Sequence, residues 1–100
     1  MKIDFTQVLK TLDGTEMKVP GDKVFTLAMA TTEALLASYE DEKSLSGEEK
    51  ASRYTLALAI HASVEPLDLK VEDVALIKKL VAKGYGPLIV GQAWMLLDPQ

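Results

Sequence analysis

The side chains that could do chemistry in this chain do not gather into a recognisable catalytic or metal-binding pattern. The one histidine, His61, lies between Ile60 and Ala62, with no partner at a spacing suited to acid–base work or to metal ligation. In such a stretch we expect a helix residue at the edge of the core, with its ring nitrogen reaching water. Cysteine is absent, so thiol chemistry and disulfides are excluded. The serines have no base and orienting acid in a triad pattern, and the sequence predicts neither an enzyme nor a cofactor.

Three consecutive acids, Glu40, Asp41 and Glu42, are the strongest cluster of charge. They lack the alternating acidic spacing of a calcium loop, and adjacent acids in a loop usually stay solvated. Together with Glu48 and Glu49 they could present negative charge to a basic surface. We therefore take Glu40, Asp41 and Glu42 as candidate protein-contact residues.

Composition narrows the classes of partner. The net charge is −4 and Arg53 is the only arginine, so the basic stripe that binds nucleic-acid phosphates is missing. No apolar stretch approaches the roughly 20 residues that span a bilayer, and the start of the chain lacks the apolar region of a signal peptide. We expect a cytoplasmic protein without nucleic-acid or membrane partners. One hundred residues fit a single domain, residues 1–100.

Helix signals dominate after residue 25. Thr26 can cap a helix whose broad apolar face extends to Ser38, and Ser46 with Glu49 has the spacing of a capping box for a helix from Gly47 to Ala62. A third helix begins near Val71 and ends before Gly84, since glycine suits the position just after a helix. Gly86-Pro87 begins a fourth. The pattern predicts a mainly α fold, a compact bundle of about four helices over residues 26–98.

The first twenty residues fit two descriptions. Asp13-Gly14 is a turn dipeptide between two short apolar segments, Val8–Leu12 and Glu16–Val19, which favours a short β-hairpin within residues 1–20. The apolar residues of the first segment also fit a helical turn that ends at Gly14. The hairpin is slightly favoured, and Pro20-Gly21 ends the segment.

The last helix is apolar on every side, with only Gln92 interrupting it. Such a helix must be covered all round. Either it lies at the centre of the fold, wrapped by the other three helices, or a second chain covers its outer side through Trp94 with Leu97 or Ile89. Tryptophan and methionine are typical of interface centres, so Ile89, Trp94 and Leu97 are also candidate protein-contact residues.

Several short segments resemble small proteins encoded by tailed bacteriophages and prophages. They cover much of the chain and carry packing and capping residues: Leu12–Gly14, Leu35–Leu36, Asp41–Lys43, Leu45–Lys50, Asp73–Lys78 and Tyr85–Gln92. The resemblance implies a bacterial cytoplasmic setting. Small acidic helical proteins of this kind include assembly helpers, such as tail assembly chaperones, and inhibitors of host enzymes or defence complexes.

The expected function is therefore a non-enzymatic phage or prophage accessory role through protein–protein binding, first in virion (tail) assembly. The alternative is an acidic inhibitor that binds a host enzyme or defence complex. Because apolar residues make up 48% of the chain and lie on several helical faces, we also expect a homo-oligomer.

Overall fold

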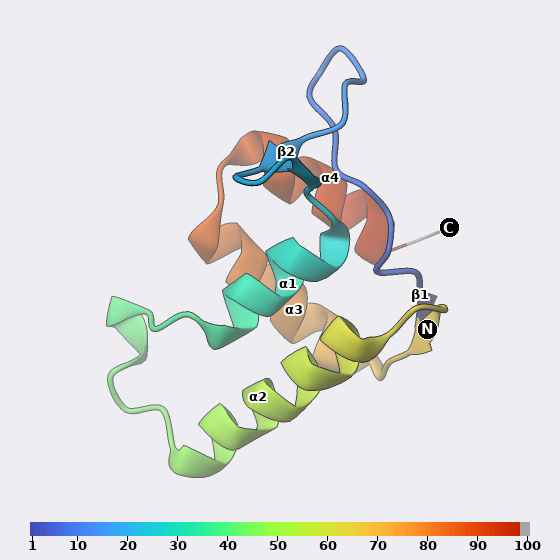
Figure 1. The fold of residues 1–100 in the computed structure, drawn as a ribbon. Coiled ribbons are helices and arrows are strands. Elements are labelled where there is room, and N and C mark those ends of the chain that lie inside the picture. Colours follow the sequence, from blue (N-terminus) through green and yellow to red (C-terminus); the bar gives the residue numbers. More distant parts are fainter. Residues whose placement is uncertain (99–100) are drawn as a thin grey trace.

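A computed structural model describes residues 1–98, and its mainly helical fold confirms the predicted class (Figure 1). Two short antiparallel strand pairs and one 3-10 turn accompany the four helices. The helices are α1 (Leu27–Leu36), α2 (Gly47–Ala62), α3 (Val71–Gly84) and α4 (Pro87–Leu97). The remaining elements are η1 (Glu40–Glu42) and the pairs β1 (Lys2–Ile3) with β4 (Leu67–Asp68) and β2 (Lys18–Val19) with β3 (Lys23–Val24).

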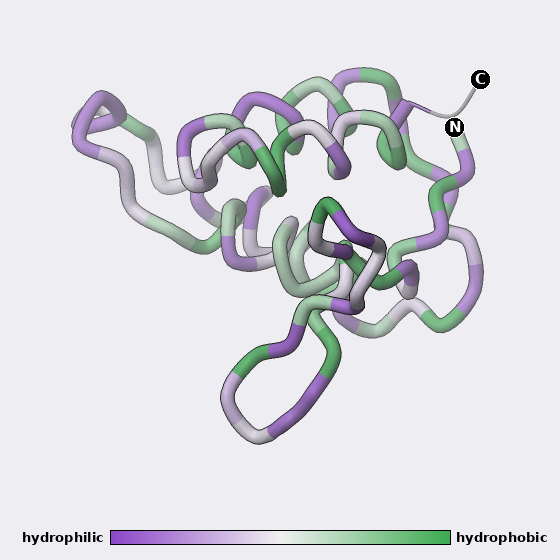
Figure 2. The backbone as a smooth tube through the Cα atoms, turned by 90° about the horizontal axis from the view of Figure 1, so that it is seen from above, coloured by the Kyte–Doolittle hydropathy of each residue, from purple (hydrophilic) through white to green (hydrophobic). Residues whose placement is uncertain are grey.

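The helix at the centre of the fold is α1. It packs against α2 on one side and α3 on the other, and α4 packs against α3 (Figure 1). Its alanines and threonines allow neighbouring helices to approach closely, and the buried Thr31 hydroxyl donates to the Leu27 carbonyl at 2.8 Å. Of the two alternatives for the last helix, a central position wrapped by the other three helices is therefore wrong. Figure 2 shows hydrophilic and hydrophobic positions mixed along the backbone, within the helices as well as between them.

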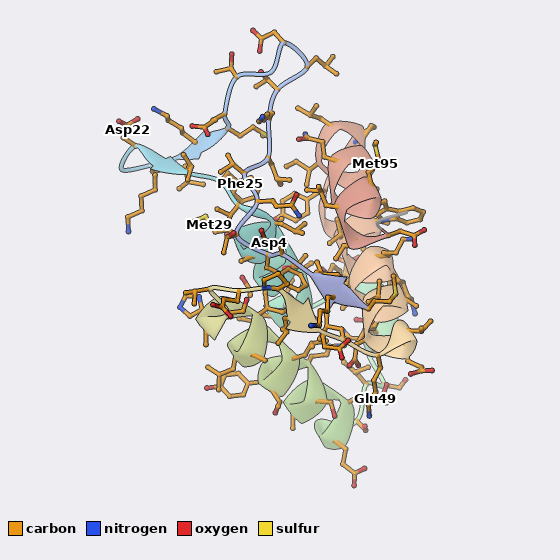
Figure 3. All side chains as sticks on the ribbon, turned by 90° about the vertical axis from the view of Figure 1, so that its right-hand side faces the viewer. Asp4, Asp22, Phe25, Met29, Glu49 and Met95 are labelled. Carbon is orange, nitrogen blue, oxygen red and sulfur yellow. The ribbon has the colours of Figure 1, made fainter. Side chains whose placement is uncertain are left out.

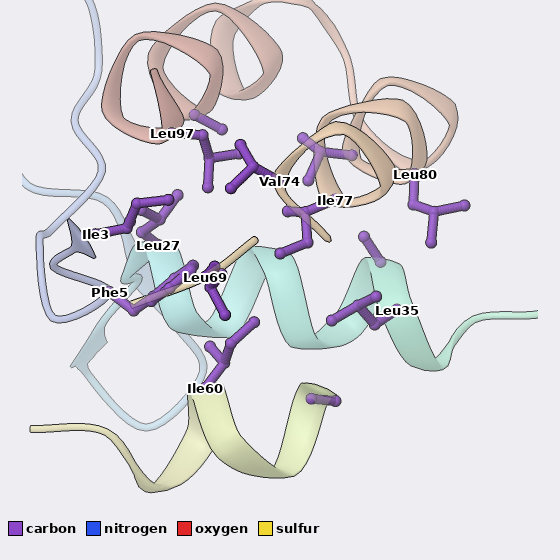
Figure 4. Close-up of a cluster of buried hydrophobic side chains, with 14 residues drawn as sticks. Ile3, Phe5, Leu27, Leu35, Ile60, Leu69, Val74, Ile77, Leu80 and Leu97 are labelled. Atoms are coloured by element: carbon purple, nitrogen blue, oxygen red, sulfur yellow. The ribbon is translucent and has the colours of Figure 1, made fainter. Parts of the chain in front are cut away.

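The N-terminal segment completes the core. Ile3 and Phe5 are fully buried, and backbone N–H groups at the start of α1 donate to the carbonyls of Phe5 and Gln7. Figure 4 shows Ile3 and Phe5 beside Leu27, while side chains of α3 and α4 approach from above α1 and Ile60 of α2 from below. The core thus draws on both ends of the described chain.

The predicted hairpin is present, with a turn at Asp13-Gly14. The Thr11 N–H donates to the Thr15 carbonyl at 2.8 Å, and Gly14 has a φ of +90°, a conformation that favours glycine. A single isolated bridge, between Lys10 and Glu16, flanks this turn, however, and the regular ladder forms later, between β2 and β3. The tight β2–β3 turn places Gly21 at a φ of +93° (Figure 3 labels the adjacent Asp22).

Most predicted helix ends are confirmed by their capping contacts. The Met29 N–H donates to the Thr26 hydroxyl, and both bonds of the Ser46–Glu49 capping box are present. Pro87 occupies the first turn of α4. Gly84 differs from the prediction, because it is the last helical residue and the chain becomes extended at Tyr85. The Tyr85 ring lies 6.2 Å from the Phe25 ring, and this packing fits the extended path of the chain.

Candidate protein-binding surfaces

Two of the three acids in the cluster, Asp41 and Glu42, form ion pairs with other side chains of the same chain. The Arg53 guanidinium donates to both carboxylate oxygens of Glu42, at 2.8 and 2.7 Å, and the two side chains are 8% and 11% exposed. The Lys83 ammonium lies 3.0 Å from Asp41 and 3.4 Å from Glu42. Because Arg53 faces inward from α2, it requires a counter-ion there. This removes Glu42 from the candidate contact residues, while Asp41 remains on the rim.

These ion pairs hold η1 against α2 and α3. The hydrogen bonds from Arg53 lower the pKa of Glu42 from 4.5 to about 2, and the charges of Arg53 and Lys83 act in the same direction. The Tyr39 hydroxyl, just before η1, donates to the Ala34 carbonyl at 2.7 Å and contacts the Leu80 carbonyl at 3.3 Å. Among residues 1–98, no ion pair involves Glu40, which is exposed. The network is structural, and Glu40 alone of the three acids is uncommitted in this part of the chain.

The last helix has an inner and an outer side. Leu97 is fully buried in the main core, so it cannot be a contact residue, and Ile89 is half-buried against a second small core cluster around Leu9 and Phe25. The outer side exposes Leu88, Gly91, Trp94 and Met95, and we call these four residues the outer α4 surface. Met95 is 78% exposed and Trp94 42%. Of the predicted contact residues of α4, Trp94 is the one that lies on this surface.

Trp94 is held in place at the edge of the outer α4 surface. Its indole N–H donates to the Lys78 carbonyl at 3.1 Å, and the Lys78 ammonium lies 5.0 Å from the centre of the ring. The same ammonium is 3.8 Å from the Asp98 carboxylate. The ring is therefore fixed against α3, which leaves less side-chain entropy to lose when another surface covers it.

A second apolar surface lies between α1 and α2. Leu36, Tyr54 and Leu58 are each more than half exposed and surround a hollow of about 150 Å³. Thr32, Ala57 and the exposed His61 complete its lining. We call this site the α1–α2 hollow. Its lining, drawn from residues 1–98, contains no carboxylate, lysine or arginine.

Sequence reasoning missed this hollow because it located α2 by its capping box and did not divide the apolar residues of the helix between an inner and an outer side. In the structure Arg53, Ala57 and Ile60 face the core, whereas Tyr54 and Leu58 face outward. A sequence signal for this division was present. Ala57 and Leu58 are adjacent apolar residues, and two adjacent residues of a helix do not both lie on one narrow apolar stripe.

His61, the residue that the sequence offers for acid–base chemistry or metal binding, has no second such residue beside it among the described residues that line the hollow. His61 is exposed on α2, at the edge of the α1–α2 hollow. Within residues 1–98 the structure brings together no group of three side chains that could hold a metal ion. In the same range, no helix is both long and apolar enough to cross a membrane. The outer α4 surface and the α1–α2 hollow are therefore suited to apolar contacts with another molecule.

Comparisons with protein-family models, with curated proteins and with solved structures gave no match to this chain. The likeness to phage-encoded proteins therefore rests on the short sequence segments alone.

Proposed function

We propose that this chain is a non-catalytic protein that acts by binding another protein, and that the α1–α2 hollow receives an apolar side chain of that partner. The observation that carries the proposal is the exposure of Leu36, Tyr54 and Leu58 around one hollow, at 58%, 58% and 53%. Large apolar side chains gathered at a concave site are typical of places where a partner inserts an anchor residue.

The chemistry of the hollow fits an apolar anchor better than a charged one. Since no carboxylate, lysine or arginine of residues 1–98 lines it, a charged group would lose its hydration without gaining one of these side chains as a counter-ion. Full burial of a leucine contributes about 1.5–3 kcal/mol, so covering the exposed half of Leu58 contributes about 1 kcal/mol. The Tyr54 hydroxyl and the His61 ring can add polar contacts at the edge. We expect binding that changes little with salt, because apolar contacts are not screened.

The phage setting is part of the proposal and is supported by the sequence resemblance. In that setting the leading role is virion assembly, with a tail protein as the partner. The inhibitor alternative depends on a free acidic face, and it loses support because Asp41 and Glu42 already pair with Lys83 and Arg53. The observations therefore favour assembly through an apolar contact.

Capture experiments with a matched pair of variants test this function. The tagged wild-type chain, Leu58→Glu and Thr55→Glu would each be used to capture proteins from bacteria producing a tailed phage. Leu58 lines the hollow, whereas Thr55 is an exposed residue of the same helix outside it. We expect the wild type and Thr55→Glu to retain an identified virion protein, and Leu58→Glu to lose it.

Binding of the identified protein would then be measured by calorimetry with purified components. We expect Leu58→Ala to weaken the affinity about five-fold, the equivalent of about 1 kcal/mol. Equal binding by wild type and Leu58→Glu would show that the hollow is not the binding site. Retention of host proteins alone would rule out the assembly role.

A further inference from the structure

The outer α4 surface lies on the opposite side of the molecule from the α1–α2 hollow. In Figure 1, α2 lies on one side of α1 and α4 on the other, beyond α3. The eleven residues of α4 include no charged side chain, although 26% of the whole chain is charged. Three large apolar residues of this helix are nevertheless exposed: Leu88 at 37%, Trp94 at 42% and Met95 at 78%. Figure 3 shows Met95 at the outer edge of the molecule.

We propose that a second copy of this chain covers the outer α4 surface, with the two α4 helices antiparallel and crossing between Gly91 and Gln92. This inference goes beyond the proposed function, because it concerns a different surface and leaves the α1–α2 hollow open. The resulting dimer would carry two hollows.

Charge favours a second copy at this surface. Each chain has a net charge of −4, so two copies repel each other over most approaches. Repulsion is weakest where the facing helices carry no charged residue, which is the case for α4, and the charges at its edge, Lys78 and Asp98, have opposite signs and pair with each other. The α1–α2 hollow also contains no carboxylate, lysine or arginine from the described part of the chain, but it is concave, and two hollows cannot fill each other.

The shape of the outer α4 surface is self-complementary, as a two-fold interface requires. Gly91 lies in its middle, with Leu88 one turn before it and Met95 one turn after it. A Cβ atom added at Gly91 would meet no atom within 4 Å, so the middle of the surface is low and open. In the antiparallel arrangement Leu88 of each copy lies against Met95 of the other, and the two glycines allow the helix backbones to approach closely.

The ends of the helix pair are also complementary. The N-terminus of α4 begins at Gly86, which supplies no side-chain cap, and the first turn contains no acid. Asp98, half exposed, follows the C-terminus of α4. An antiparallel pair brings Asp98 of each copy beside the N-terminus of α4 in the other copy, where the helix dipole favours negative charge.

The expected dimer is weak. One helix from each copy forms the centre of the contact, which places the buried area at the low end of specific interfaces, below about 1,200 Å² in total. Such interfaces are usually transient, so we expect a dissociation constant on the order of 10 μM.

Analytical ultracentrifugation over about 1–500 μM protein tests the dimer. We expect the wild type to pass from monomer to dimer across this range, and Met95→Glu to stay monomeric because the contact then buries two unpaired carboxylates. Leu58→Glu, the same kind of change on the other surface, should dimerise like the wild type. A monomeric wild type at the highest concentration, or unchanged dimerisation of Met95→Glu, would overturn the proposal.

Cysteine cross-linking tests the antiparallel register, and the chain has no native cysteine to interfere. An equimolar mixture of Leu88→Cys and Met95→Cys should form a disulfide-linked heterodimer on mild oxidation. Leu88→Cys alone should not cross-link, because two copies of position 88 would lie about 10 Å apart along the axis, at about 1.5 Å per residue. A disulfide needs Cα atoms about 4.4–6.8 Å apart. Efficient linking of Leu88→Cys to itself would refute this register.

The two proposals fail separately. If the chain is monomeric but Leu58→Glu loses the captured partner, only the dimer is wrong. If Met95→Glu is monomeric while Leu58→Glu still captures the partner, only the role of the hollow is wrong.

Discussion

Replacing Leu97 by alanine tests the division of α4 into a buried and an exposed side. Leu97 is fully buried among side chains of the main core, where Figure 4 shows it near Val74 and Ile3. The change removes three carbon atoms, which corresponds to about 2.4 kcal/mol of transfer free energy at about 0.8 kcal/mol per methylene. A residual cavity adds to this value, although the last turn of a terminal helix can partly collapse into the space. We expect a loss of about 3 kcal/mol in the free energy of unfolding.

Met95→Ala is the matched control, because Met95 belongs to the same helix and is 78% exposed. Below the concentration of dimerisation it should change stability by less than about 0.5 kcal/mol. Urea unfolding, followed by circular dichroism and by the fluorescence of Trp94, measures both variants. With a slope of about 1.5 kcal/mol per M, Leu97→Ala should lower the midpoint by about 2 M. If both variants lost the same stability, Leu97 would not be a core residue and the assignment of the two sides would be wrong.

Three further predictions concern the loops and caps. The pKa of Glu42 is lowered in the folded state to about 2, so its contribution to stability is present above pH 4.5 and is lost as pH falls from there toward 2. Urea unfolding at a series of pH values should show this loss. In Glu42→Gln the free energy of unfolding should fall less steeply as the pH is lowered, and an unchanged dependence on pH would contradict the pairing with Arg53. Ser46→Ala should lower the free energy of unfolding, measured with a denaturant, by about 1 kcal/mol, because it removes the cap of α2. Equal stability would show that the capping box does not stabilise the fold. Gly21→Ala should cost about 1–2 kcal/mol for backbone reasons alone, because a Cβ meets open space at a φ of +93°; no loss in thermal unfolding would contradict that conformation.

Local signals in the sequence predicted the helices well. The Ser46–Glu49 box fixed the start of α2, Thr26 the start of α1, and Pro87 the start of α4, because a cap or a proline acts on backbone groups within one turn. The turn at Asp13-Gly14 was likewise predicted, since glycine tolerates its positive φ.

The sequence did not show which of the apolar helices lies at the centre of the fold. It left open whether α4 is central or lies at a contact surface, and for the second case it put Trp94 on the same surface as Leu97 or Ile89. The structure separates them, because α1, with its small alanine and threonine side chains, admits neighbours on two sides, and α4 then covers only one flank of α3.

The same distinction applies to charge. The sequence identified Glu40, Asp41 and Glu42 as one acidic cluster, and only the fold shows that Arg53 and Lys83 approach two of them. Arg53 is eleven residues from Glu42 in the chain, and Lys83 is more than forty residues from either acid, so no local pattern could pair them. By itself the sequence determined the helices and their caps. The tertiary structure decided which apolar and acidic side chains remain exposed, because burial depends on contacts between segments distant in the chain.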